Sequence, residues 1–173
     1  YGPRTDVQVT GGDPTLRQRD ELVAIVRYIS EKGMRPSLFT NGILATRDLL
    51  AELSGAGLVD VAFHVDMTQG RKGFRNEQEL NVVRREYIER ARGLNLAVIF
   101  NTTLFAGNFA EVPMLVKFFA SAADVVNFAS FQLQADTGRG VLRQREDTIN
   151  IDNTIARIHA GAGGRLSFDA LQN

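Results

Sequence analysis

Cysteine is absent from this sequence of 173 residues. Its absence excludes disulfide bonds, thiolate chemistry and any metal held by thiolates within these residues. Net charge is absent as well, because 20 Lys and Arg residues balance 20 Asp and Glu residues and are scattered among them. A protein that binds nucleic acid normally carries a basic patch or stripe. We therefore expect no nucleic-acid partner.

Long hydrophobic runs are also missing from the chain. No apolar segment approaches the roughly 20 residues that cross a bilayer, and the first residues lack the pattern of a signal peptide. Apolar residues make up 44% of the chain and charged residues 23%, which is ordinary for a globular domain with a sizeable core. The sequence therefore predicts a single domain over residues 1–173, located in the cytoplasm and without a membrane span.

Short apolar segments typical of strands alternate with amphipathic segments typical of helices. The predicted strands are 7–9, 36–40, 59–65, 96–104 and 125–133, and the predicted helices are 18–32, 45–53, 77–92, 110–122 and 152–160. A loop at 137–140 and a last short strand at 165–168 complete the pattern. Such alternation implies a parallel sheet with right-handed crossovers. The sequence therefore predicts an α/β fold, either an open doubly wound sheet or a segment of a barrel.

The predicted helix 77–92 is rich in Arg and Glu. Its apolar residues, among them Leu80, Tyr87 and Ile88, recur at the spacing of one buried stripe. We interpret the charged residues as a solvated face with ion pairs four residues apart.

Polar residues stand at the carboxyl ends of four predicted strands. They form the segments Thr10-Gly11-Gly12-Asp13-Pro14, Thr40-Asn41-Gly42, His64-Val65-Asp66 and Asn101-Thr102-Thr103. The paired glycines of the first segment let the backbone approach a ligand closely. Because α/β sheets and barrels bind ligands at the carboxyl ends of their strands, we predict one small-molecule site formed by these segments.

Each segment also has a structural interpretation. Asp13 is a residue type that caps the first turn of a helix, and Asn41 followed by glycine is a common turn. His64 and Asp66 are two residues apart and therefore point to the same side of a strand. The pair could ligate a metal, form a hydrogen-bonded acid-base pair, or contain a histidine with a purely structural role.

Two further groups of polar residues are ambiguous in the same way. Gln132 and Gln134 share one side of a predicted strand, where they either line a cavity or face solvent at a sheet edge. Arg71, Lys72 and Arg75 lie in a polar loop that either contacts an anionic substrate or is solvated.

In the order of these motifs, residues 7–136 resemble the core of the radical S-adenosylmethionine (SAM) enzymes. Gly11-Gly12-Asp13-Pro14 is similar to the Gly-Gly-Glu-Pro segment that holds the SAM ammonium in that family, and Thr40-Asn41-Gly42 is similar to the Thr-Asn-Gly turn of its next strand. The segments 63–66, 101–103 and 130–134 match the polar ends of the three strands that follow. Among the family's branches, the chain resembles the MoaA-like proteins, including relatives of the tetraether lipid synthases.

The resemblance implies a partial, TIM-like barrel with a parallel sheet. It implies that SAM is bound by Gly11, Gly12, Asp13, Thr40, Asn41, His64, Asp66, Asn101, Thr102, Gln132 and Gln134. It also implies an oxidoreductase-type parent enzyme in which a [4Fe-4S] cluster reduces SAM to give a 5′-deoxyadenosyl radical. The substrate and the catalytic side chains do not follow from it.

Two departures from the family pattern stand out. Asp13 replaces the usual glutamate, so its carboxylate is one methylene closer to the backbone. The CxxxCxxC loop that holds the cluster is missing, and no other cysteine replaces it. We therefore expect that the chain is a fragment whose first strand and cluster loop lie upstream of Tyr1. Such an incomplete barrel leaves apolar sheet edges open, so the fragment is expected to self-associate.

Two other functions compete with this prediction. One is a metal-dependent hydrolase or lyase on a (βα) barrel that uses Asp13, His64 and Asp66. The other is a non-catalytic binding module built on a cysteine-free barrel.

Overall fold

The computed structural model describes residues 5–134 and 149–165 of the chain. The described part contains a five-stranded sheet in which every neighbouring pair of strands is parallel. The strands are β1 (Asp6–Val9), β2 (Arg35–Thr40), β3 (Asp60–His64), β4 (Ala97–Leu104) and β5 (Val126–Leu133). The α-helices are α1 (Arg19–Glu31), α2 (Arg47–Gly55), α3 (Glu77–Ala91), α4 (Val112–Ser121) and α5 (Ile151–Ala162). Short 3-10 helices occupy Pro14–Leu16, Met67–Gln69 and Phe109–Glu111.

The predicted alternation of strands and helices is confirmed, and most boundaries differ from the sequence-based ones by one or two residues. The start of the predicted helix 110–122 is not α-helical, because Phe109–Glu111 form a 3-10 turn and α4 begins only at Val112. The predicted loop 137–140 lies outside the described residues. The predicted strand 165–168 lies outside them too, except for Arg165, which has irregular backbone.

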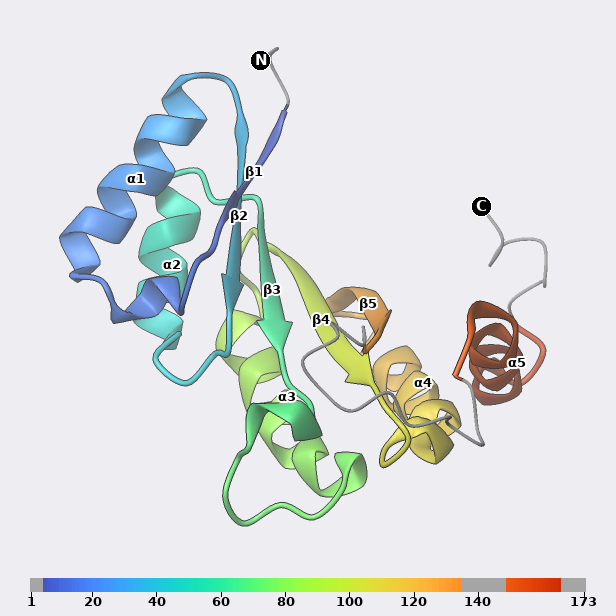
Figure 1. The fold of residues 1–173 in the computed structure, drawn as a ribbon. Coiled ribbons are helices and arrows are strands. Elements are labelled where there is room, and N and C mark those ends of the chain that lie inside the picture. Colours follow the sequence, from blue (N-terminus) through green and yellow to red (C-terminus); the bar gives the residue numbers. More distant parts are fainter. Residues whose placement is uncertain (1–4, 135–148, 166–173) are drawn as a thin grey trace.

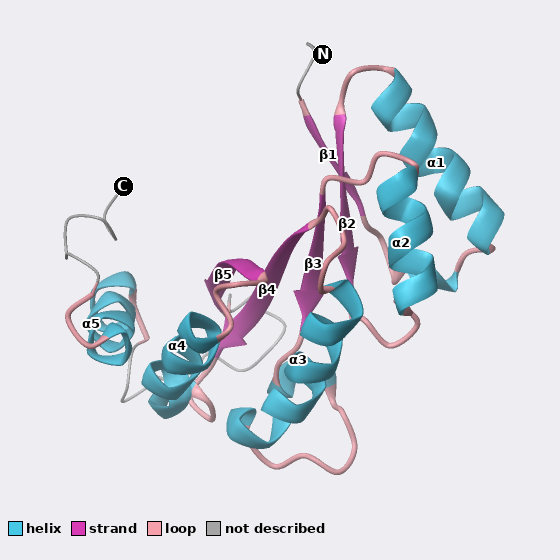
Figure 2. Cartoon of the chain, turned by 180° about the vertical axis from the view of Figure 1, so that it is seen from behind, coloured by secondary structure: helices cyan, strands magenta, loops and turns pink. Residues whose placement is uncertain are grey.

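The five strands follow one another across the sheet in the order of the sequence. A doubly wound sheet reverses this order at a switch point, whereas a barrel keeps it. Crossovers of one hand then bring successive helices to one face. In both views α1 and α2 accordingly lie together on one side of β1 and β2, and α3 passes behind the end of β3 in Figure 1 and in front of it in Figure 2. The fold is therefore α/β, with the arrangement of a partial TIM-like barrel.

The hydrophobic core lies between the sheet and these helices. On β3, Val61 and Phe63 are fully buried in this core, whereas Ala62 and His64 line a pocket on the opposite face. The alternation follows from strand geometry, in which successive side chains point to opposite faces. Phe63 packs against Phe100 of β4 with ring centroids 5.6 Å apart. The core thus covers one face of the sheet and leaves the polar face open.

The charged run on α3 corrects one prediction from the sequence. Glu79 does pair with Arg75 at the exposed start of the helix, as expected. Glu77 and Arg84, however, are completely buried and form an ion pair with each other. A solvated face does not bury charges, and burial is tolerated here because the two side chains neutralise each other. None of the described helices combines the length and the apolar character needed to cross a membrane.

Candidate functional site

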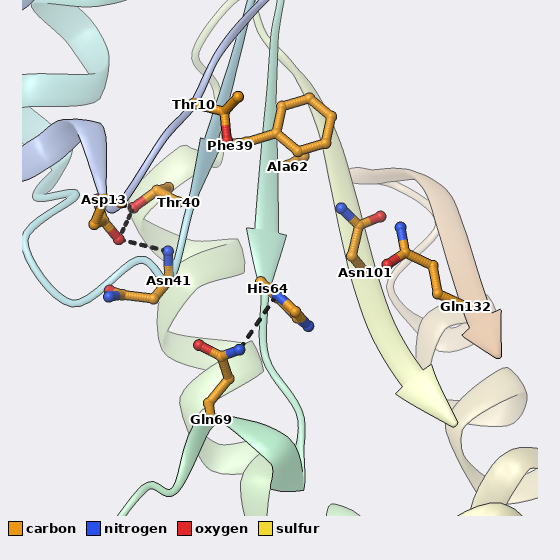
Figure 3. Close-up of a pocket in the computed structure, with 11 residues that line it drawn as sticks. Thr10, Asp13, Phe39, Thr40, Asn41, Ala62, His64, Gln69, Asn101 and Gln132 are labelled. Carbon is orange, nitrogen blue, oxygen red and sulfur yellow. Dashed lines mark hydrogen bonds between the residues drawn. The ribbon is translucent and has the colours of Figure 1, made fainter. Parts of the chain in front are cut away.

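A cavity of about 390 Å³ opens on the uncovered face of the sheet, near the carboxyl ends of the strands (Figure 3). The predicted residues among its lining are Gly12, Asp13, Thr40, Asn41, His64, Asn101 and Gln132. The lining also contains Thr10, Phe39, Ala62 and Gln69. Gly11, Asp66, Thr102 and Gln134 are not part of the lining. The structure thus brings together most of the predicted residues. The residues that line the pocket lie up to 122 positions apart in the sequence, from Thr10 to Gln132.

Asp13 lies at the end of β1 and is held by three other residues. Its Oδ1 accepts hydrogen bonds from the amide and hydroxyl of Thr15, at 3.0 and 2.6 Å. Its Oδ2 accepts from the amide of Asn41 at 2.7 Å, and the hydroxyl of Thr40 lies 2.9 Å from both oxygens. Burial alone raises the pKa of Asp13, but these hydrogen bonds outweigh it and lower the pKa below its usual value of 3.8.

These contacts make Asp13 both a structural cap and an available acceptor. It caps the 3-10 turn Pro14–Leu16, as the structural interpretation predicted. A carboxylate has about four acceptor positions, and the hydroxyl of Thr40 donates its single proton to one oxygen at a time. Oδ2 therefore keeps acceptor capacity toward the pocket, where a positively charged or hydroxyl group of a ligand could donate to it.

The turn after β2 depends on Gly42. Its φ is +79°, and a Cβ there would lie only 2.1 Å from the ring of Tyr87. Asn41 uses its side-chain Oδ1 to accept from the amide of Ile43 at 2.9 Å, which leaves its Nδ2 as the group for a ligand. The Asn-Gly turn therefore has a structural role, and it also brings the Asn41 backbone amide to Asp13.

His64 ends β3 and has contacts on both ring nitrogens. Its Nε2 lies 2.7 Å from Oδ2 of Asp66 and 3.1 Å from the hydroxyl of Thr103. Its Nδ1 lies 3.3 Å from Nε2 of Gln69, another residue of the pocket (Figure 3). An ionised Asp66 accepts hydrogen bonds only, so neutral His64 carries its proton on Nε2, and its Nδ1 accepts a hydrogen bond from the side-chain amide nitrogen of Gln69.

Asp66 is not exposed to the pocket at all. It follows β3 and caps the turn Met67–Gln69, where its Oδ1 accepts from the amide and hydroxyl of Thr68. Its Oδ2 also accepts from the amide of Thr103 at 2.6 Å. Burial raises the pKa of Asp66, but the hydrogen bonds from His64, Thr68 and Thr103 together lower it to about 2. Asp66 is therefore ionised and acts on a ligand only through His64.

Thr102 lies on the opposite face of β4 from the pocket. It is completely buried, and its hydroxyl makes no hydrogen bond with any described residue. Asn101 and Thr103 point to the pocket side, so the residue between them points toward the helices. The motif predicted Asn101 and Thr102 in one site. Successive residues of a strand point to opposite faces, so only Asn101 lines the pocket.

Asn101 and Gln132 bring two carboxamides to one wall of the pocket (Figure 3). Asn101 is only 7% exposed and Gln132 is exposed, and both line the pocket. Each carboxamide carries donors and an acceptor that a ligand or water in the pocket can pair with. Gln134 is exposed and lies outside the pocket lining, so the two predicted glutamines are separated.

The polar loop after β3 has a third role that the sequence did not suggest. Arg71 donates to the backbone oxygen of Asn41 and to the hydroxyl of Tyr87, the latter at 3.1 Å. It thereby ties the loops after β2 and β3 to α3. Gln69, in the same loop, lines the pocket and was missed, because no periodic pattern marks a residue in a short 3-10 turn.

The chemistry of the site is that of recognition by hydrogen bonds. The described residues contain no group of three or more His, Asp or Glu side chains arranged to hold a metal ion. The pocket instead offers the Asp13 carboxylate at one end, His64 bonded to Gln69 in the middle and the carboxamides of Asn101 and Gln132 at the other end (Figure 3). These groups suit an elongated ligand with hydrogen-bond donors at one end and a mixed donor and acceptor edge at the other.

The chain is similar to several curated enzymes. It is 29% identical over 116 residues to the PqqA peptide cyclase of Bradyrhizobium diazoefficiens, a match over 64% of this chain and 29% of that protein. It is 30% identical over 135 residues to the PqqA peptide cyclase of Rhodopseudomonas palustris, covering 73% of this chain and 34% of that protein. It is also 46% identical over 61 residues to a probable GTP 3′,8-cyclase of Saccharolobus islandicus, covering 34% of this chain and 19% of that protein.

The chain spans about a third of the length of the peptide cyclases that it matches. No family model matches it. The relatives differ in the reaction that their names describe, but all of them are radical SAM proteins. The similarity to several such enzymes, together with the predicted βα arrangement, shows that this chain belongs to the radical SAM superfamily.

Proposed function

We propose that this chain is the SAM-binding part of a radical SAM enzyme. The observation that carries the proposal is the order of polar groups across the pocket, from the carboxylate of Asp13 through Nδ1 of His64 to the carboxamides of Asn101 and Gln132. SAM has its donors and acceptors in a corresponding order, with an ammonium at one end, ribose hydroxyls in the middle and the adenine edge at the other end.

The residues present fit SAM chemically. Oδ2 of Asp13 would accept a hydrogen bond from the ammonium, and a charge-assisted bond of this kind is about twice as strong as a neutral one. A ribose hydroxyl would replace the Gln69 amide as the donor to Nδ1 of His64. The carboxamide of Asn101, on the wall of the pocket, would donate to and accept from the adenine edge or a water beside it. A cavity of about 390 Å³ is within the range typical of small-molecule sites.

The iron-sulfur cluster must be supplied from outside this chain, because the sequence contains no cysteine. With the cluster bound, SAM would supply a 5′-deoxyadenosyl radical that removes a hydrogen atom from the substrate. The residues of this chain would bind and orient SAM and exclude water from it. The enzyme names of the relatives support an enzymatic role for the whole protein.

The binding test compares SAM with adenosine, which lacks the amino-acid end. We expect Asp13→Asn to weaken SAM binding about tenfold or more, because a hydrogen bond to a charged group is lost, and to leave adenosine binding unchanged. Asparagine keeps an acceptor for the amide of Thr15, which caps the turn, but its NH₂ would face the amide of Asn41. Urea unfolding of the variant measures the resulting loss of stability, and binding is compared below the unfolding range. The matched control is Asp60→Asn, which changes a carboxylate of β3 outside the pocket lining.

NMR titration of the chain would measure all of these affinities. Failure of SAM to bind, or equal weakening by Asp13→Asn and Asp60→Asn, would contradict the proposal. The catalytic role is tested on the protein encoded by the full reading frame, reconstituted with iron and sulfide without oxygen. It predicts 5′-deoxyadenosine among the products, and its absence with an intact cluster would refute that role.

Self-association and cytoplasmic localisation remain predictions. β5 is an edge strand of the described sheet, and Phe128 on it is 60% exposed. An exposed apolar edge strand favours pairing with another copy. Sedimentation of the chain over a range of concentrations would show a dimer if this is correct and a monomer if it is not.

A further inference from the structure

A buried ion pair lies beneath the pocket and does not line it. Glu77 and Arg84 project from α3, and both side chains are completely buried. Breaking such a pair is costly, but replacing both partners by uncharged residues of similar size is often neutral or even stabilising. Stability alone therefore does not explain why two charges occupy this place, and their hydrogen bonds indicate another role.

The ion pair holds the backbone on both sides of Asp66. Nη2 of Arg84 donates to the carbonyl oxygen of Val65 at 2.8 Å. Oε1 of Glu77 accepts from the amide of Met67 at 3.0 Å. Arg84 is itself fixed, because its Nη1 donates to the carbonyl of Glu77 at 2.8 Å. The position of Asp66, at the end of β3, is thus set from α3.

The same carboxylate also reaches the end of β4. Oε1 of Glu77 accepts from Nδ2 of Asn108 at 2.7 Å, and this nitrogen lies 2.9 Å from the carbonyl oxygen of Thr103. Oδ1 of Asn108 accepts from the amide of Phe105 at 2.9 Å. Asn108 is completely buried as well. The end of β4 and the end of β3 are therefore held by one buried network.

The two residues that this network holds are those that contact Nε2 of His64. Asp66 lies 2.7 Å from that nitrogen, and the hydroxyl of Thr103 lies 3.1 Å from it. Asp66 and Thr103 are also joined to each other, since the amide of Thr103 donates to Asp66 at 2.6 Å. A change in the network would therefore alter the hydrogen bonds that decide which ring nitrogen of His64 carries the proton.

We propose that Glu77 and Arg84 are positioning residues that act through Asp66 and Thr103 to keep the proton of His64 on Nε2. Nδ1 thereby stays an acceptor on the pocket side, where it accepts from Gln69 and where a donor of the ligand would replace Gln69. This arrangement resembles the way in which outer residues orient a histidine in metal sites and catalytic triads. Only the identity of the ligand rests on the proposed function. The effect on His64 itself is a property of the free chain.

The test of positioning is long-range proton-nitrogen NMR of the histidine rings at about pH 8, where unperturbed histidine is neutral. The chain has two histidines, so His159 serves as an internal reference. In the natural chain we expect His64 to show the signals of the form protonated on Nε2. In the double variant Glu77→Gln/Arg84→Met, which leaves no buried charge unpaired, we expect the form protonated on Nδ1 to appear for His64 and not for His159.

The control for a general loss of stability is Thr46→Ala. It removes the cap that accepts from the amide of Leu49 at 3.3 Å at the start of α2, a helix that carries no residue of the network. His64 should keep its signals in this variant. A folded double variant with unchanged His64 signals would overturn the proposal, and so would an identical change in Thr46→Ala.

A milder variant covers the case in which the double variant does not fold. Asn108→Ala removes the arm that reaches Thr103 and keeps the ion pair of Glu77 and Arg84. It should also bring His64 partly into the other form, and unchanged signals would overturn the proposal. Adenosine titration supplies the second readout. Asn108→Ala, and the double variant if it folds, should bind adenosine about three- to tenfold more weakly than the natural chain, which is the effect of one lost hydrogen bond. If the His64 signals change but adenosine binds neither protein, positioning stands and the proposed function fails.

Discussion

Replacement of Asp66 by asparagine should change how the stability of the chain depends on pH. The pKa of this carboxyl is lowered from its ordinary value of 3.8 to about 2 in the folded chain. A folded pKa below the unfolded one means that the ionised group stabilises the fold. This stabilisation is fully present above about pH 4 and is lost as the pH falls through 2.

The size of the effect follows from the shift in pKa. A shift from 3.8 to about 2 corresponds to about 2 kcal/mol of unfolding free energy, at 1.36 kcal/mol per pKa unit, and about half of it should already be lost at pH 3. At pH 7, Asp66→Asn should cost about 2 to 4 kcal/mol, because an amide NH₂ would face the Nε2 proton of His64 or the amide of Thr103 without an acceptor between them.

Urea unfolding at pH 7 and pH 3 measures both effects. On acidification, the natural chain should lose about 1 kcal/mol more than Asp66→Asn does, since only the natural chain has this carboxyl to protonate. Asp124→Asn is the control. Asp124 also has a lowered pKa, but it pairs with Arg92 on the surface, so its removal should leave the pH dependence nearly unchanged. Parallel pH curves for Asp66→Asn and the natural chain would refute the argument that buried hydrogen bonds hold Asp66 ionised.

Two further substitutions, Gly42→Ala with Gly70→Ala as its control and Thr102→Val, test the packing around the site by urea unfolding. Gly42→Ala should destabilise the chain by about 2 to 3 kcal/mol, because its Cβ would lie 2.1 Å from the ring of Tyr87 and its φ is positive. Gly70→Ala has a positive φ but nothing within 4 Å, so it should cost only about 1 kcal/mol, and equal losses would contradict the packing argument. Thr102→Val should leave stability unchanged or raise it by about 1 kcal/mol, because it removes a buried hydroxyl that lacks a partner among the described residues. A clear loss of stability would show that this hydroxyl has a partner.

The alternation of strands and helices was predictable from the sequence because it depends on local patterns. An apolar strand such as β4 and an amphipathic helix such as α1 each carry their period in consecutive residues. Polar residues at strand ends were also visible, and parallel pairing brings those ends to one edge of the sheet. For this reason the sequence alone assigns Asp13, His64 and Asn101 to one pocket, and all three line it.

The roles within the site were not predictable in the same way. The burial of Glu77 and Arg84 depends on where α3 packs against the ends of β3 and β4, and a run of charges looks the same on a solvated helix. Gln69 reaches the pocket only because a short turn follows Asp66. Long-range contacts of this kind leave no periodic trace in the chain.

The sequence by itself determined the α/β pattern, the absence of cysteine ligands and the set of polar residues from which the site is built. Only the tertiary structure decided that the sheet is singly wound, that Thr102 faces the helices, and that Asp66 acts through His64 from a buried position. The reason is physical: periodicity is written in neighbouring residues, whereas burial and hydrogen bonding depend on segments that meet only after the chain has folded.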